Sequence, residues 1–195
     1  RHLNFPDTID GVIISRIDAL PPQEQLLLKV ASVVGRIFAL RTLREIHPVA
    51  NDRMQLPEYL THLRALDITP LEIPEPDQAY IFKHIITHEV AYNLLLFQQR
   101  RDLHRFVAEW HERAYGEDLS PYYPLLSYHW RVAEDTDKQI KYLELAGGQA
   151  MRNGAYHEAI EFFMALIVAS WSRGGTSMSS ATRAFPKVMV TSGPA

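Results

Sequence analysis

Cysteine is absent from the sequence, and its absence excludes several kinds of site at once. Disulfide frameworks, thiolate zinc sites, iron–sulfur clusters and cysteine nucleophiles all depend on the thiol group. A chain without disulfides does not need an oxidising compartment. We therefore expect a reducing, cytoplasmic location.

An excess of charge of either sign is absent as well, because 20 Lys and Arg residues are balanced by 23 Asp and Glu residues. Neutralising the phosphates of a nucleic acid requires a surplus of basic residues, so this balance argues against a general nucleic-acid-binding protein. No apolar run approaches the ~20 residues that a membrane span requires, and no secretion signal is visible. We therefore expect neither a membrane partner nor direct nucleic-acid binding.

Known catalytic and phosphate-binding motifs are missing too. The sequence has no nucleophile elbow, no paired-carboxylate motif and no phosphate-binding glycine loop. Gly147 and Gly148 lie in a helical pattern and lack a following Lys-Ser or Lys-Thr. We predict that this chain is not itself an enzyme and that it holds no cofactor and no metal ion of its own. The start at Arg1 rather than Met indicates a piece of a longer protein.

Hydrophobic residues make up 47% of the 195 residues, which is enough for one domain of ordinary size or two small ones. Apolar residues at helical spacing predict four helices in the first third of the chain, over residues 8–20, 22–34, 40–47 and 56–66. Pro22 is expected to open the second of these helices, and Gly35 to end it.

The period of the apolar pattern then changes from 3.6 residues to 2. Residues 68–73 and 78–83 are predicted as two short strands, separated by a loop that contains two prolines. Helices followed by a strand–loop–strand pair are the order of a winged-helix unit. We therefore predict a mainly α fold that begins with a winged helix, whose wing is a small β-hairpin.

The second half of the chain is helical again, with helices predicted over residues 85–97, 101–115, 125–132, 138–152 and 156–171. In the last two, small residues alternate with aromatic ones on either side of a turn at Asn153-Gly154. This pattern is typical of a tetratricopeptide-like (TPR-like) hairpin, and any other helical hairpin remains the alternative. Residues 172–195 contain no acid and are rich in Ser, Thr and Gly, so we predict that they are disordered.

Four histidines are the side chains most suited to binding a ligand: His84 and His88 are four residues apart, and His104 and His111 are seven apart. Histidines at such spacing can bind a metal ion, but a second histidine of the zinc-peptidase motif is missing after His88. The alternative for His88, His104 and His111 is a partly buried or interfacial imidazole with a hydrogen-bond partner. His84 differs because it lies where a predicted strand meets a helix, and the start of a helix offers amide groups to an anion.

Basic residues suggest two further hypotheses. The arginines within residues 100–105 are interleaved with acids, which favours a solvated helix face over a basic patch. Reading of DNA by the helix at 56–66 would depend on His62 and Arg64, with Arg53 just before it. So few cationic or polar side chains argue against direct recognition of DNA.

Four stretches of sequence form a further pattern. Residues 5–22 read FPDTIDGVIISRIDALPP, residues 27–38 read LLKVASVVGRIF, and residues 101–104 read RDLH. Residues 80–92 read YIFKHIITHEVAY, with an aromatic, a basic residue, His, an apolar pair and a downstream Glu and Tyr. Together, over about residues 5–169, they resemble the end of the AAA-like ATPase module and the winged-helix region of STAND signalling proteins.

This combination is most familiar from bacterial class III adenylate/guanylate cyclases. In the STAND family the winged-helix histidine senses nucleotide by reaching the ADP phosphates, and by position that residue is His84. The resemblance implies a regulatory role in a parent protein that binds ATP or ADP with Mg. The phosphate loop, the magnesium-binding motif and the cyclase residues would then lie before Arg1. Two alternatives are the equivalent region of a LuxR-type transcription regulator and a free-standing TPR-like interaction module.

The resemblance and the periodicity together predict five segments and two partners. The partners are the upstream ATPase module in cis, and a protein bound by the TPR-like helices. The segments are residues 1–22, the end of the ATPase module's helical subdomain; 23–97, the winged helix; 98–135, a helical linker; 136–171, the TPR-like hairpin; and 172–195, a disordered tail.

Overall fold

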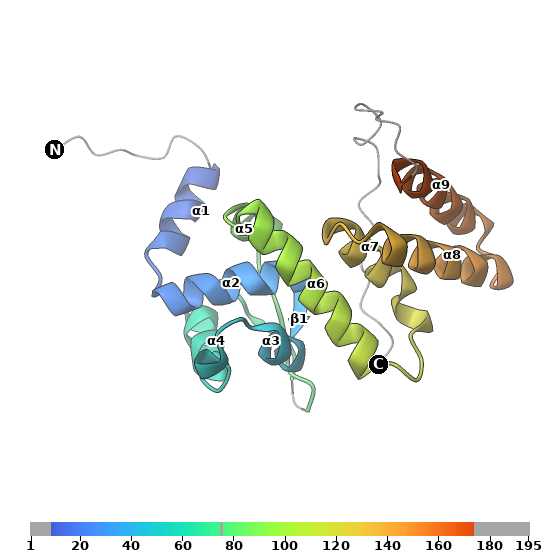
Figure 1. The fold of residues 1–195 in the computed structure, drawn as a ribbon. Helices are drawn as coiled ribbons and strands as arrows, with labels where there is room; N and C mark the ends of the chain where they lie inside the picture. Colours follow the sequence, from blue (N-terminus) through green and yellow to red (C-terminus); the bar gives the residue numbers. More distant parts are fainter. Residues whose placement is uncertain (1–8, 75, 174–195) are drawn as a thin grey trace. The chain divides into compact units, whose positions relative to one another are not determined.

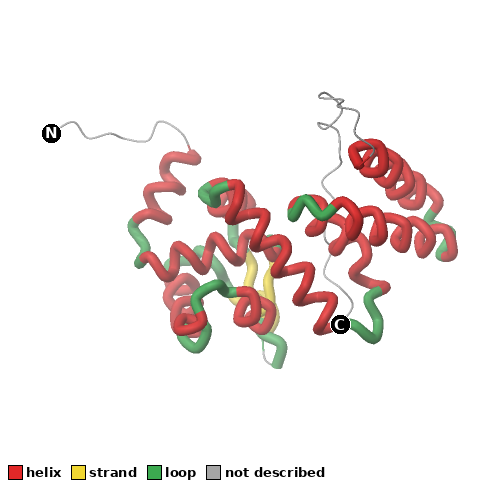
Figure 2. The backbone as a smooth tube through the Cα atoms, in the orientation of Figure 1, coloured by secondary structure: helices red, strands yellow, loops and turns green. Residues whose placement is uncertain are grey.

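The computed structural model describes residues 9–74 and 76–173, and in these ranges the chain is mainly helical with one small antiparallel sheet (Figures 1 and 2). The chain divides into two compact units, Arg1–Leu103 and His104–Ala195. They are called the first and the second unit below, and each is described by itself. The five segments predicted from the sequence are finer than this division and remain predictions.

The central helix of the first unit is α2 (Pro22–Val34), which follows α1 (Ile9–Asp18). Pro22 occupies the first turn of α2, where its missing N–H removes no helical hydrogen bond. The buried face of α2 is broad, because even the adjacent residues Leu27 and Leu28 are both completely buried. Gly35 ends the helix with a φ of 147°. The predicted start and end of this helix are therefore confirmed.

The sheet of the first unit has three strands, β1 (Ile37–Ala39), β2 (Leu71–Ile73) and β3 (Ala79–Ile81), in the order β1-β3-β2. Both pairings are antiparallel, and Phe38 lies opposite Tyr80. The prediction of a two-stranded hairpin was therefore incomplete. The missing strand, β1, has only three residues, too few for an alternating pattern, and its partner is about forty residues away in the chain.

Two further helices belong to the first unit, α3 (Leu40–Ile46) and α4 (Leu56–Ala65), and a short 3₁₀ turn lies between them. Leu56, Leu60 and Leu63 are completely buried. Their spacing of four and three residues places them on one face of α4, as the sequence predicted.

The first unit ends in α5 (Ile85–Asn93) and the beginning of α6 (Phe97–Ala114). The sequence placed the break between these helices at residues 98–100, and this prediction was wrong by about four residues. The side chain of Gln99 accepts a hydrogen bond from the Leu96 amide, at 3.0 Å, in the position of a capping-box residue. The side chain of Arg100 donates to the carbonyls of Asn93 and Leu95, which end α5.

The second unit contains the rest of α6, a 3₁₀ turn at Ser120–Tyr122, α7 (Tyr123–Val132), α8 (Thr136–Arg152) and α9 (Tyr156–Arg173). Its buried core consists of side chains from α6, α7 and α8 and the residue after α7: Ala108, Leu126, Trp130, Ala133 and Tyr142. Asp135 caps the start of α8 by accepting a hydrogen bond from the Lys138 amide.

Helices α8 and α9 form an antiparallel hairpin around the predicted turn at Asn153 and Gly154 (Figure 1). A Cβ atom on Gly147 would lie 2.8 Å from the ring of Phe163, so only glycine permits this close approach of the two helices. Helix α9 continues to Arg173. Ser172 and Arg173, predicted as the start of a disordered tail, are therefore helical, and the rest of that tail lies outside the described residues.

Candidate functional site

The candidate site is the N-terminus of α5, where the chain leaves β3 and turns into the helix. His84 is the N-cap residue, with extended backbone angles of φ −114° and ψ 130°. Its carbonyl accepts hydrogen bonds from the amides of Thr87 and His88, while its exposed side chain makes no capping bond within the described part of the chain. The imidazole of His84 is therefore presented at the surface, at the positive end of the helix.

A small hollow lies beside His84. Its apolar floor consists of Ile17 and Ile68, both buried, and its rim is polar. Arg16 of α1 contributes to that rim, and its guanidinium donates a hydrogen bond of 3.3 Å to the carbonyl of Leu66. The remaining lining residues are Ile13, Asp67 and Thr87.

Asp67, on the rim of this hollow, is held in an unusual backbone conformation. Its φ is 59°, and it follows the end of α4 in a Schellman motif, in which the Ile68 amide donates to the carbonyl of Leu63. The carboxylate of Asp67 forms an ion pair with Lys83. Both side chains of this pair are exposed, so the pair contributes little stability.

Two features beside His84 would attract an anion. Arg16 lines the same hollow, and the first turn of α5 carries no acid, while the carboxylate of Asp67 on the rim is paired with Lys83. The enclosed volume is only about 10 Å³, enough for about one water molecule. A phosphate group can therefore contact His84 from the surface, but a whole nucleotide would need additional walls from another domain.

The structure does not bring His84 and His88 together as a pair of ligands. His88 Nε2 lies 2.9 Å from the carbonyl of Ser32, and its ring contacts Phe82 edge-on at 5.3 Å between centroids. In the described residues, no group of three or more His, Asp or Glu side chains is arranged to hold a metal ion. The geometry of His88 agrees with the interpretation of a hydrogen-bonded, partly buried imidazole.

His104 and His111 are buried in the second unit, and both lie near a third histidine that sequence reasoning missed. Nδ1 of His104 is 2.8 Å from Nδ1 of His129, and Nδ1 of His111 is 2.8 Å from the carbonyl of Val107. Burial lowers the pKa of His129 well below its usual value, and the neighbouring His104 and His111 lower it further. His129 is on another helix, so spacing along the chain gave no signal for it.

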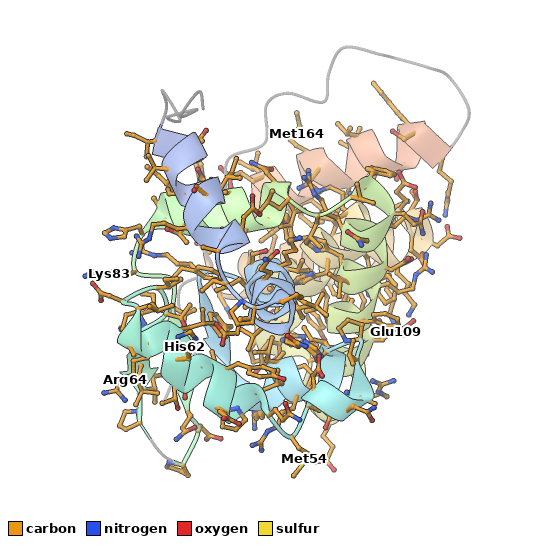
Figure 3. All side chains as sticks on the ribbon, turned by 90° about the vertical axis from the view of Figure 1, so that its left-hand side faces the viewer. Met54, His62, Arg64, Lys83, Glu109 and Met164 are labelled. Atoms are coloured by element: carbon orange, nitrogen blue, oxygen red, sulfur yellow. The ribbon has the colours of Figure 1, made fainter. Side chains whose placement is uncertain are left out.

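The residues considered for DNA reading make contacts within the first unit. His62 Nδ1 lies 2.8 Å from the carboxylate of Glu24, and Arg53 donates to the carbonyl of His47. Figure 3 shows His62 and Arg64 on α4. These contacts occupy His62 and Arg53.

Comparison with known proteins identifies no relative: no protein-family model, no curated protein and no solved structure matches this chain. A search of the described helices for a membrane span also gave none with the length and apolar character that a crossing requires. A function for this chain is therefore inferred from its own residues.

Proposed function

We propose that this chain is a non-catalytic regulatory region of a multidomain signalling ATPase of the STAND type. In this proposal the parent protein is a cytoplasmic adenylate or guanylate cyclase, and the region couples the nucleotide state to the output domain. One observation carries the proposal: His84 is exposed at the N-terminus of α5, shortly after β3, and lines a hollow together with Arg16.

The order of elements in the first unit supports the winged-helix part of the proposal. Helix α2 is followed by β1, then by α3 and α4, and then by the pair β2 and β3. The sheet order β1-β3-β2, with β3 in the middle, is the arrangement expected when the loop between β2 and β3 forms a wing. His84 would then lie where the wing returns to a helix.

The small size of the hollow supports a site that is shared between two domains. A volume of about 10 Å³ cannot enclose a nucleotide, so a phosphate sensor here requires an upstream ATPase module to hold the base and ribose. Helix α1 exposes Ile9 and Val12, which are 69% and 49% accessible and would suit contact with such a module. The parent would bind ATP or ADP with Mg, and His84 would contribute a hydrogen bond to a phosphate oxygen.

The first test is to read the coding sequence upstream of Arg1. We expect a phosphate loop and an acidic magnesium-binding motif, preceded by a cyclase domain. A DNA-binding domain in the parent instead would favour a LuxR-type regulator. The absence of any phosphate loop would contradict the proposal.

The role of His84 is tested in the full-length parent with His84→Ala. We expect faster loss of bound ADP and higher basal activity, because the imidazole no longer holds the closed state. His157→Ala is a matched control, since its side chain is 90% exposed on α9. Unchanged ADP retention and unchanged basal activity would overturn the assignment. Tight ADP binding by the present chain alone would overturn the proposal that the nucleotide site is shared with an upstream module.

A second candidate function, from a different class, is a protein-interaction module that uses only its helical repeats. The close approach of α8 and α9 at Gly147 favours it, because small residues in the seam are typical of TPR-like hairpins. If the first unit could be deleted from the parent without changing its regulation, this function would replace the first.

A further inference from the structure

The outer face of α9 is an apolar stripe that no described residue covers. Five side chains, four or three residues apart, run along this face: Tyr156, Ile160, Met164, Ile167 and Trp171. Four of them are 60% to 67% accessible, and Ile167 is 44% accessible. Val168, which is 39% accessible and lies four residues after Met164, also belongs to it. Figure 3 shows Met164 pointing outward from α9.

The opposite face of α9 is already occupied. Ala159 and Ala169 are buried, and the ring of Phe163 packs against Gly147 of α8. The exposed stripe is therefore a second apolar face, additional to the one that holds the hairpin together. A helix that is apolar on nearly all sides is normally covered on all sides.

The outer face is close to symmetric about its midpoint. Ile160 and Val168 lie four residues before and after Met164, and Val168 is also exposed. Tyr156 lies eight residues before Met164, and Trp171 seven residues after it. The order aromatic, aliphatic, methionine, aliphatic, aromatic therefore reads nearly the same in both directions. A surface of this kind is complementary to itself under a two-fold rotation.

The charges on α9 decide the direction of such pairing. Glu158 and Glu161 lie in the N-terminal half of the helix, and Arg173 lies in its last turn. A parallel pair would place the acids of one helix beside the acids of the other. An antiparallel pair brings Arg173 of one helix, whose guanidinium also donates to Asp137 of its own chain, toward Glu158 of the other. It also aligns the helix dipoles favourably.

We infer that the outer face of α9 binds a second copy of this chain, in an antiparallel helix pair whose two-fold axis passes near Met164. Ile160 of each copy then packs against Val168 of the other, and Tyr156 lies near the other copy's Trp171. This inference does not depend on the proposed nucleotide-sensing role of His84.

The first experiment measures the mass of the whole 195-residue chain by sedimentation equilibrium. We expect a concentration-dependent species of twice the monomer mass of 22.4 kDa. Met164→Glu is expected to weaken the dimer by at least about tenfold, because it buries a charge at the centre of the interface. A monomer at all concentrations would overturn the inference.

A matched control is available for Met164→Glu. Met54 is 83% accessible and lies in the first unit, before α4, so Met54→Glu adds the same charge at another exposed methionine. We expect Met54→Glu to dimerise like the unaltered chain. Dimerisation that survives Met164→Glu would place the contact elsewhere and overturn the inference. Circular dichroism of both variants checks that their helix content is unchanged.

The absence of cysteine permits a direct test of direction. In an antiparallel pair only residues near the axis meet their own copy, so Met164→Cys is expected to form a disulfide-linked dimer on oxidation. Tyr156→Cys, far from the axis, is expected to remain uncrosslinked. Efficient crosslinking through Tyr156→Cys would indicate a parallel pair. The absence of crosslinking through Met164→Cys would exclude the proposed axis. Either result would overturn the inference.

Discussion

The two units arrange their buried polar side chains differently. In the first unit these side chains are spread over several elements, and Glu24 of α2 pairs with the half-exposed His62 at the edge. In the second unit three buried histidines, His104, His111 and His129, lie together, and the partly buried Glu112 has three partners. Loss of one member of such a cluster leaves several polar groups unpaired, so we expect the second unit to depend more on exact pairing.

Glu112 shows how much the second unit depends on the pairing of its polar groups. Its carboxylate accepts hydrogen bonds from the indole of Trp130, the hydroxyl of Tyr142 and the ammonium group of Lys138. These three partners belong to α7 and α8, so one side chain of α6 joins three helices. Burial, together with the carboxylate of Glu112, raises the pKa of Tyr142, which keeps its hydroxyl protonated as a donor.

The largest expected effect comes from removing this carboxylate. Glu112→Ala leaves two buried donors without an acceptor, and we expect it to lower the free energy of unfolding by about 3 kcal/mol. Glu24→Ala in the first unit loses a single partner, and we expect about 1 kcal/mol. Denaturant unfolding followed by tryptophan fluorescence measures the effect in the second unit, because Trp110, Trp130 and Trp171 all lie there. Equal losses would show that the two units do not differ in this way.

An intermediate effect is expected from pH. The folded pKa of His129 is well below the unfolded value of about 6.5, so below pH 6.5 the unfolded chain binds a proton that the folded chain does not. Stability is therefore lost as the pH falls from 6.5 toward the folded pKa, by about 1 kcal/mol per pH unit. Unfolding curves at several pH values, followed by tryptophan fluorescence, measure this slope.

The variant His129→Gln tests the assignment of that slope. Glutamine can still accept a hydrogen bond from His104 but does not titrate, so we expect a smaller loss of stability in acid. Burial also lowers the pKa of His47 in the first unit, so part of the slope should remain by circular dichroism. His157→Gln, at an exposed histidine, should leave the slope unchanged. If the stability of His129→Gln fell with pH as steeply as that of the unaltered chain, another group would be responsible for the pH dependence.

The smallest expected effect is a gain in stability. Glu134 follows α7 with a φ of 58°, in a Schellman motif in which the Asp135 amide donates to the carbonyl of Trp130. Glycine adopts this conformation without strain, so we expect Glu134→Gly to raise the free energy of unfolding by about 0.5 kcal/mol. Asp67 has the same position after α4, with a φ of 59°, so Asp67→Gly tests the same relief of backbone strain in the first unit. Thermal unfolding of both variants makes the comparison, and a loss in Glu134→Gly would contradict it.

Local signals predicted much of the fold. Pro22 and Gly35 marked the ends of α2, and apolar spacing predicted α4, α8 and α9. The features that were missed depend on contacts between distant residues or on a single side chain. Strand β1 exists because β3 pairs with it, and at the break before α6 the side-chain oxygen of Gln99 accepts a hydrogen bond from the Leu96 amide. No periodicity within one segment contains that information.

The features of the candidate site also divide into local ones, which the sequence predicted, and ones that depend on distant residues, which it did not. A histidine between a strand and a helix was visible in the sequence, and the structure has His84 as the N-cap of α5. Neither the small volume of the hollow nor the presence of Arg16 on its rim could be predicted, because α1 lies far from His84 in the chain. The partner of His104 was missed for the same reason, since His129 belongs to another helix.

The contact between His104 and His129 also provides an internal probe. A distance of 2.8 Å between the two Nδ1 atoms is that of a hydrogen bond, so one ring donates its Nδ1–H and the Nδ1 of the other ring accepts it. Both side chains are at most 1% accessible, so this hydrogen is shielded from water. It should give a slowly exchanging imidazole N–H resonance in a magnetic resonance spectrum. That resonance would disappear when α6 and α7 separate, and it would report unfolding of the second unit without any added label.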